Sequence, residues 1–113
     1  NSASFGKIFK VNEELASELV FQNARLIAEE LQALGIDVNC APVLDLFESN
    51  ASDIIGDRAF SSDPFATSIL GKSFIKGLES GGVAPVVKHI PGHGRAEVDS
   101  HLALPKIEAK LTR

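Results

Sequence analysis

The feature that most limits the fold of this chain is its alternation of helix-like and strand-like segments. Asn12, Glu13 and Glu14 begin a predicted helix, because carboxylates in the first turn are favoured by the helix dipole. Gly35 ends that helix. Its apolar residues recur at steps of three and four, which predicts an inward stripe of Val20, Ala24, Ile27, Leu31 and Leu34.

Two short apolar segments, residues 36–46 and 83–89, are predicted as buried strands because they are rich in β-branched residues. The first leaves into a polar loop at Asp45, and that loop is of a length at which loops are usually functional. Between the strands, Asp63 and Pro64 begin a second helix that ends at Gly81 and Gly82. Its expected inward face is Leu70, Phe74, Gly77 and Leu78.

Residues 106–113 resemble the first turns of a further helix. Strands that alternate with helices predict parallel βα units and therefore the α/β class. Two strands cannot form a closed parallel sheet covered on both faces, and a (β/α)₈ barrel needs about 250 residues. We therefore expect the 113 residues to be an internal part of a larger barrel or open α/β sheet.

Composition excludes several classes of function. The chain is 44% hydrophobic and 23% charged, which is typical of a globular protein. Its net charge of −4 and its scattered lysines and arginines argue against a nucleic-acid-binding surface. No apolar run approaches the roughly 20 residues that span a membrane. The single cysteine, Cys40, excludes an internal disulfide and agrees with a reducing compartment.

All three histidines lie within "KHIPGHGRAEVDSHLALP", residues 88–105. Lys88 and His89 end the second predicted strand, and in α/β barrels the ends of the strands carry the active site. Gly92 and Gly94 permit a positive φ or a close approach of the backbone to a ligand. The alternative is a strand that surfaces into an ordinary polar loop.

Asp99 and His101 are separated by one residue, so in an extended segment they point to the same side. A carboxylate there could orient the imidazole for general acid–base catalysis near neutral pH. Alternatively, Asp99 bonds a backbone amide beside an exposed histidine. Arg58 could clamp oxygen atoms bidentately, or it could be a solvated charge beside Asp57.

The three histidines, His89, His93 and His101, could also supply three nitrogen ligands to a metal ion. Their spacings of four and eight residues in a glycine-rich loop match none of the stronger zinc patterns. A metal site therefore remains an alternative to the acid–base interpretation of the same loop.

Three stretches, "APVLDL", "IGDRAFSSDP" and "KHIPGHGRAEVDSHLALP", together resemble glycoside hydrolase family 3, in its bacterial β-N-acetylhexosaminidase branch. The resemblance covers essentially the whole chain, so residues 1–113 would be a fragment of the family's N-terminal catalytic domain. It implies a TIM-type (β/α)₈ barrel, of which this chain holds internal βα units only. It also implies retaining hydrolysis of terminal β-linked N-acetylglucosamine, in cytoplasmic peptidoglycan recycling.

The resemblance further implies a role for each candidate residue. Those matching Arg58, Lys88 and His89 hold the sugar hydroxyls, whereas His101 is the acid/base and Asp99 pairs with it. No metal or cofactor is implied, and the partner is a small carbohydrate rather than nucleic acid or a membrane. The nucleophilic aspartate lies outside this chain, so the fragment alone is expected to be inactive.

Three alternatives stay open at this point. One is a β-glucosidase-type member of the same family, although the Asp99–Ser100–His101 segment favours the N-acetylglucosaminidase branch. The second is a metal-dependent hydrolase built on the three histidines. The third is a sugar-binding remnant without catalysis.

Overall fold

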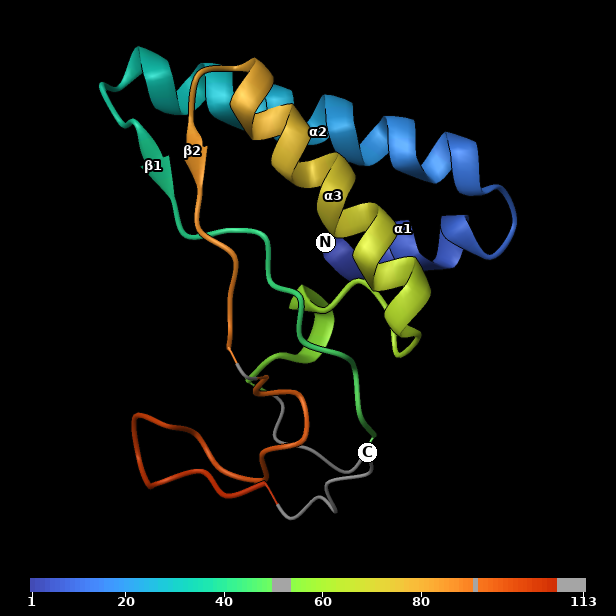
Figure 1. The fold of residues 1–113 in the computed structure, drawn as a ribbon, viewed down its shortest axis with the longest axis vertical. Coiled ribbons are helices and arrows are strands. Elements are labelled where there is room, and N and C mark those ends of the chain that lie inside the picture. The colour runs from blue at the N-terminus through green and yellow to red at the C-terminus, as the bar shows by residue number, and fades with distance from the viewer. Residues whose placement is uncertain (50–53, 91, 108–113) are drawn as a thin grey trace.

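The computed structural model describes residues 1–49, 54–90 and 92–107. Three α-helices pack together, and a short parallel strand pair lies beside them, with a long loop region below (Figure 1). The elements in chain order are α1 (Ser2–Phe9), α2 (Glu13–Ala33), β1 (Val38–Asn39), the 3₁₀ turn η1 (Gly56–Arg58), α3 (Pro64–Ser80) and β2 (Ala84–Pro85). Within those described ranges, no helix is long and apolar enough to cross a membrane.

The two long helices begin where the sequence predicts. The Asn12 side chain accepts a hydrogen bond from the Leu15 amide at 2.9 Å, which caps α2. The Asp63 carboxylate accepts from the amides of Phe65 and Ala66, and Pro64 is the first residue of α3. Both predicted helices are therefore confirmed, since each start depends on a local capping signal.

Helices α2 and α3 pack closely because their contact surfaces are built from small residues. A side chain at Gly77 would overlap the Phe21 carbonyl oxygen, and one at Gly81 would overlap the Ala28 methyl group. All four predicted inward residues of α3 are buried. The buried residues of α2 are Ala16, Val20, Ala24 and Ala28.

The predicted stripe on α2 is confirmed only in part. Val20 and Ala24 are buried, and Ile27 and Leu31 pack partly against the core. Leu34 is 76% exposed, so its predicted inward position is wrong. It is the C-cap residue of α2, and it lies beyond the segment around Ala28 against which α3 ends.

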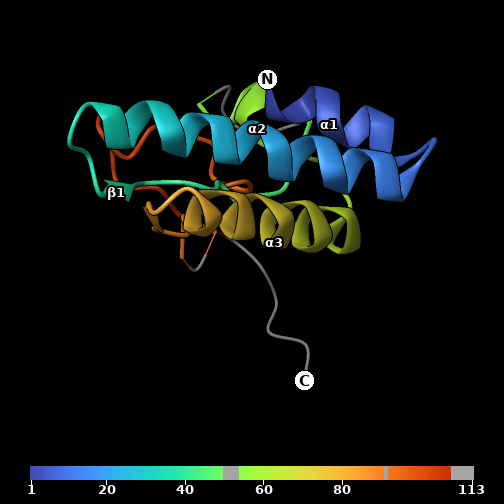
Figure 2. The ribbon, with the colours of Figure 1, turned by 90° about the horizontal axis from the view of Figure 1, so that it is seen from above.

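Strands β1 and β2 are parallel, with Val38 opposite Ala84 and Asn39 opposite Pro85. The predicted α/β class with a parallel strand–helix–strand unit is therefore confirmed, although both strands are shorter than predicted. Their predicted burial is confirmed only in part, because Val83 is 1% exposed whereas Val38 is 54% and Val86 is 43% exposed. In the described part of the chain no third strand pairs with either one. Figure 1 shows the pair beside α3 and below one end of α2, and Figure 2 shows α2 and α3 side by side.

Two further segments differ from the expectation. Helix α1 was not predicted; its N-cap is Asn1, whose side chain accepts from the Ser4 amide, and its Gly6 packs against the Phe60 backbone. At the other end, residues 106–107 are not helical. The remainder of the helix expected there, residues 108–113, lies outside the described residues.

Candidate active site

The ends of the two strands bring distant parts of the sequence together. Beyond the paired strands, the Leu44 amide donates to the Lys88 carbonyl oxygen at 2.7 Å, and the Lys88 amide donates to Pro42 at 3.1 Å. This parallel alignment places Asp45 beside the segment that carries His89. The carboxyl ends of adjacent parallel strands therefore meet here, as is typical of active sites in α/β proteins.

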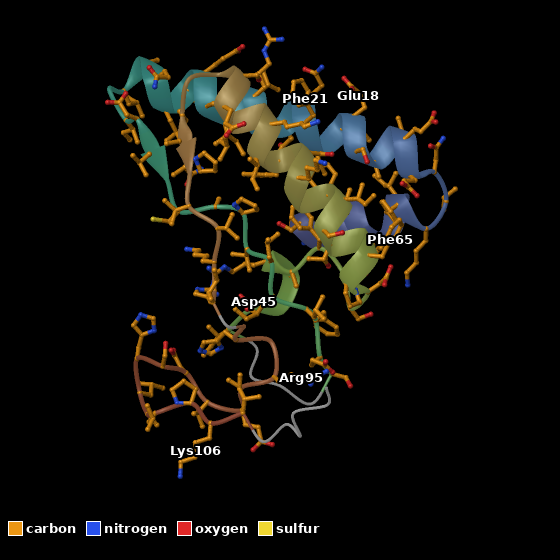
Figure 3. The ribbon with its side chains drawn as sticks, in the orientation of Figure 1. Glu18, Phe21, Asp45, Phe65, Arg95 and Lys106 are labelled. Carbon is orange, nitrogen blue, oxygen red and sulfur yellow. The ribbon has the colours of Figure 1, made fainter. Side chains whose placement is uncertain are left out.

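Asp45 is the central polar residue of this region (Figure 3). Its side chain is fully buried, and one carboxylate oxygen lies 2.5 Å from Nδ1 of His89, within hydrogen-bond distance. The other oxygen accepts from the backbone N–H of His93, also at 2.5 Å. Asp45 therefore joins the segment that follows β1 to His89 and to the backbone of His93, a role that the sequence did not indicate.

The loop after His89 packs against the segment that follows β1, and its glycines permit this. Gly92 has a φ of 128°, a conformation that favours glycine. A side chain at Gly94 would overlap the carbonyl oxygen of Leu46. The His93 ring lies 5.7 Å from the His89 ring, and within the described residues its two buried nitrogens have no hydrogen-bond partner.

Asp99 and His101 form the predicted pair. Oδ1 of Asp99 accepts from Nδ1 of His101 at 2.7 Å and from the backbone N–H of the same residue at 2.9 Å. The carboxylate thus bonds both the backbone amide and the imidazole. The geometry therefore agrees with an acid–base pair and also with a loop aspartate that bonds a backbone amide beside an exposed histidine. The His101 side chain is 86% exposed, which leaves the ring accessible to a ligand.

Arg58 and Lys88, two of the predicted sugar-binding residues, line one cavity of about 220 Å³ together with Cys40 and Phe74. Arg58 also donates to the carbonyl oxygen of Ile54 at 3.2 Å. The lining of this cavity includes neither His89 nor His101. The described structure thus brings the predicted site residues together as three groups, namely Arg58 with Lys88, His89 with Asp45, and His101 with Asp99.

The histidines do not form a three-nitrogen cluster. In the part of the chain that the structure describes, no three His, Cys, Asp or Glu side chains are grouped closely enough to hold a metal ion. His89 and His93 are neighbours, but His101 is bonded to Asp99 instead. The arrangement required by the metal alternative is therefore not formed by these residues.

The sequence matches the glycosyl hydrolase family 3 N terminal domain over residues 2–113. The chain belongs to glycosyl hydrolase family 3. A curated β-hexosaminidase from Hydrogenovibrio crunogenus is 47% identical to this family 3 chain over 97 residues, 86% of the chain and 27% of that protein. One from Idiomarina loihiensis is 44% identical over 109 residues, 96% of the chain and 32% of that protein.

Solved structures agree with this assignment to family 3. The crystal structure of NagZ from Neisseria gonorrhoeae in complex with N-trifluoroacetyl-D-glucosamine superposes with a TM-score of 0.91 at 39% identity. That match covers 98% of this chain and 33% of the NagZ chain. The family 3 chain thus spans about a third of the length of these relatives.

The Asp99 carboxyl of this family 3 chain is expected to titrate below its ordinary pKa. The backbone N–H of His101, and next its side chain, hold the pKa of Asp99 below 3.8 because both donate to the carboxylate. The contact therefore stabilises the loop above that pH and is lost as the pH falls through the lower folded-state pKa. A ¹³C NMR titration of the Asp99 carboxyl measures this midpoint.

His101→Ala is the control for that titration. Alanine keeps the backbone N–H, which is the larger cause of the lowered pKa, and removes the imidazole. The midpoint should therefore rise relative to the unsubstituted protein yet stay below 3.8. A midpoint at or above 3.8 in the unsubstituted protein would contradict the hydrogen bonding described here.

Proposed function

We propose that residues 1–113 are an internal part of a TIM-type (β/α)₈ barrel, the N-terminal catalytic domain of a family 3 glycoside hydrolase. The parallel β1–α3–β2 unit supports this, since such units are the building blocks of the barrel. The exposed side chains of Val38 and Val86 also support it, because neighbouring strands and helices of a complete barrel would cover them. The similarity to NagZ over 98% of the chain agrees.

We propose that the complete enzyme, meaning the polypeptide that carries these residues together with the rest of the barrel, removes terminal β-linked N-acetylglucosamine with retention of configuration. The observation that carries this proposal is the Asp99–His101 pair with its accessible imidazole, within a family 3 chain. The β-hexosaminidase relatives and the N-trifluoroacetyl-D-glucosamine complex of NagZ support the same sugar. We assign the activity to peptidoglycan recycling in the cytoplasm, in keeping with the free Cys40.

In the proposed mechanism, a nucleophilic aspartate from outside these residues attacks the anomeric carbon. Protonated His101 gives its proton to the departing glycosidic oxygen, so the leaving group departs as a neutral alcohol. The now neutral imidazole then takes a proton from water, which attacks the anomeric carbon and releases the sugar from the aspartate. Asp99 keeps Nδ1 of His101 directed toward itself, so proton transfer uses Nε2.

The proposed sugar-binding groups are Arg58, Lys88 and His89. Arg58 and Lys88 line one cavity, and both carry donors suited to sugar oxygen atoms. His89 follows Lys88 directly and is 36% exposed at its side chain. These positions support binding of a small polar ligand at the carboxyl ends of the two strands.

The experiment that tests the proposed function compares two substrates of the complete enzyme. We expect rapid hydrolysis of an aryl β-N-acetylglucosaminide and little hydrolysis of the matching aryl β-glucoside, with a chelator present throughout. The two substrates differ only at the acetamido group, so the ratio of their kcat/KM values measures recognition of that group.

Each other outcome points to a different enzyme. Faster cleavage of the glucoside would favour the β-glucosidase-type alternative. Activity that appears only without chelator would favour a metal-dependent hydrolase. No cleavage of either sugar would overturn the proposed activity while leaving membership of the family unchanged.

A further inference from the structure

We propose that Asp45 is a positioning residue that keeps a proton on Nδ1 of His89 and thereby presents Nε2 of that ring to the substrate. Asp45 itself is not proposed to touch the sugar. The consequence for substrate binding rests on the proposed function, in which His89 holds a sugar hydroxyl. The protonation of His89 is a separate statement that can be measured without substrate.

The geometry around Asp45 determines which His89 nitrogen carries the proton. An ionised carboxylate has acceptor oxygens only, so each group that bonds to it must be a donor. Oδ1 accepts a hydrogen bond from the backbone N–H of His93, which can act only as a donor. Oδ2 faces Nδ1 of His89, and that nitrogen must therefore carry a hydrogen.

The consequence for His89 concerns its second nitrogen. With Nδ1 protonated, Nε2 of a neutral ring is an acceptor, which suits the hydrogen of a sugar hydroxyl. In the opposite tautomer Nε2 would be a donor and would have to find a lone pair instead. Asp45 thus selects which hydrogen-bonding partner His89 offers.

The burial of Asp45 stabilises this tautomer of His89. The Asp45 side chain is fully buried, so neither of its oxygens can exchange His89 or His93 for bulk water. An unpaired buried polar group is costly, which holds both donors in place. Since Gly94 also packs on the Leu46 backbone, the loop that follows His89 is fixed against the segment that carries Asp45.

Asp45 differs from Asp99 in how its oxygens are used, and this difference supplies a matched control. Asp45 accepts two donors on two oxygens, whereas Asp99 accepts both of its donors on Oδ1 alone. An asparagine has one acceptor oxygen and one donor NH₂ group. It can therefore replace Asp99 without changing the polarity of any bond, but it cannot do so at Asp45.

Asp45→Asn is therefore expected to switch His89 to its other tautomer, in which Nδ1 carries no hydrogen. The amide oxygen takes the fixed N–H of His93, so the NH₂ group faces His89 and Nδ1 must become an acceptor. We expect ¹⁵N NMR of the histidine-labelled complete enzyme at neutral pH to show Nδ1 protonated in the unsubstituted protein and unprotonated in Asp45→Asn. His89→Gln identifies the His89 signals, and in Asp99→Asn the Nδ1 of His101 should remain protonated.

The activity of the Asp45→Asn variant provides a second test of the positioning role. Loss of the partner that orients a metal-bound histidine typically costs about 10- to 100-fold, and because Asp45 orients His89 in the same way we expect a fall of about that size in kcat/KM for Asp45→Asn. Because His101 is unchanged, the dependence of the rate on the leaving group should stay as it is in the unsubstituted enzyme. A purely structural defect would not by itself invert the protonation of one histidine nitrogen.

Two results would overturn the inference. One is an unprotonated Nδ1 of His89 in the unsubstituted protein, a measurement that does not require the variant to fold. The other is a folded Asp45→Asn variant in which Nδ1 stays protonated. If the predicted NMR inversion is found but the enzyme cleaves no N-acetylglucosaminide, the positioning role stands and only the proposed function fails.

Discussion

His101→Ala is expected to lower the rate of the complete enzyme by about 10²- to 10⁴-fold on substrates with poor leaving groups, the usual contribution of a general acid–base residue. The imidazole is 86% exposed and bonded to Asp99, so its loss removes a proton donor without opening a cavity. Substrates whose leaving groups depart without a proton should lose far less in the glycosylation step. The measurement is kcat/KM for a series of aryl β-N-acetylglucosaminides of decreasing leaving-group pKa.

The control for this prediction is Ser100→Ala, which changes the exposed residue between the two members of the pair. It should leave the dependence on leaving group unaltered. An equal loss on every substrate in His101→Ala would indicate that His101 binds the sugar rather than transfers a proton. No loss on any of them would remove His101 from the mechanism altogether.

The parts of the fold that the sequence predicted well are those specified by local chemistry. Asn12 and Asp63 cap helices through amides two or three residues away, and Gly35 has the positive φ expected beyond a helix end. The Asp99–His101 contact spans two residues, so the spacing could offer it as one of two interpretations, and the family resemblance favoured it. Each of these features depends on atoms within a few residues of one another.

The features that the sequence did not reveal depend on distant partners. Asp45 and His89 are 44 residues apart, and they meet only because the two strands run parallel in one particular register. Helix α1 packs its Gly6 on Phe60, which no local pattern near Ser2 could indicate. The exposure of Val38 likewise depends on which strands lie beside it, not on its own sequence.

One signal could have pointed to Asp45 in advance. It ends a predicted strand that is followed by a helix and a second strand, and in parallel α/β sheets both strand ends lie on the same edge. A carboxylate at the end of one strand and a histidine at the end of the next are then expected to approach each other. What the pattern could not supply is the register, which decides that Oδ2 meets His89 and that Oδ1 meets the His93 amide.

The largest expected effect on stability is at Leu70 of α3, which is completely buried in the core cluster that also holds Val20 of α2 and Phe60. Leu70→Ala should lower the free energy of unfolding by about 2–5 kcal/mol, because it removes buried methyl groups and leaves a cavity that the closely packed helices cannot fill. Urea unfolding of the complete protein, followed by circular dichroism, measures the change. Leu26→Ala is the matched control: Leu26 is 60% exposed on α2, so the same chemical change there should stay within about 0.5 kcal/mol. Similar losses in the two variants would contradict the burial of Leu70 in the core, since burial is what makes the two leucines differ.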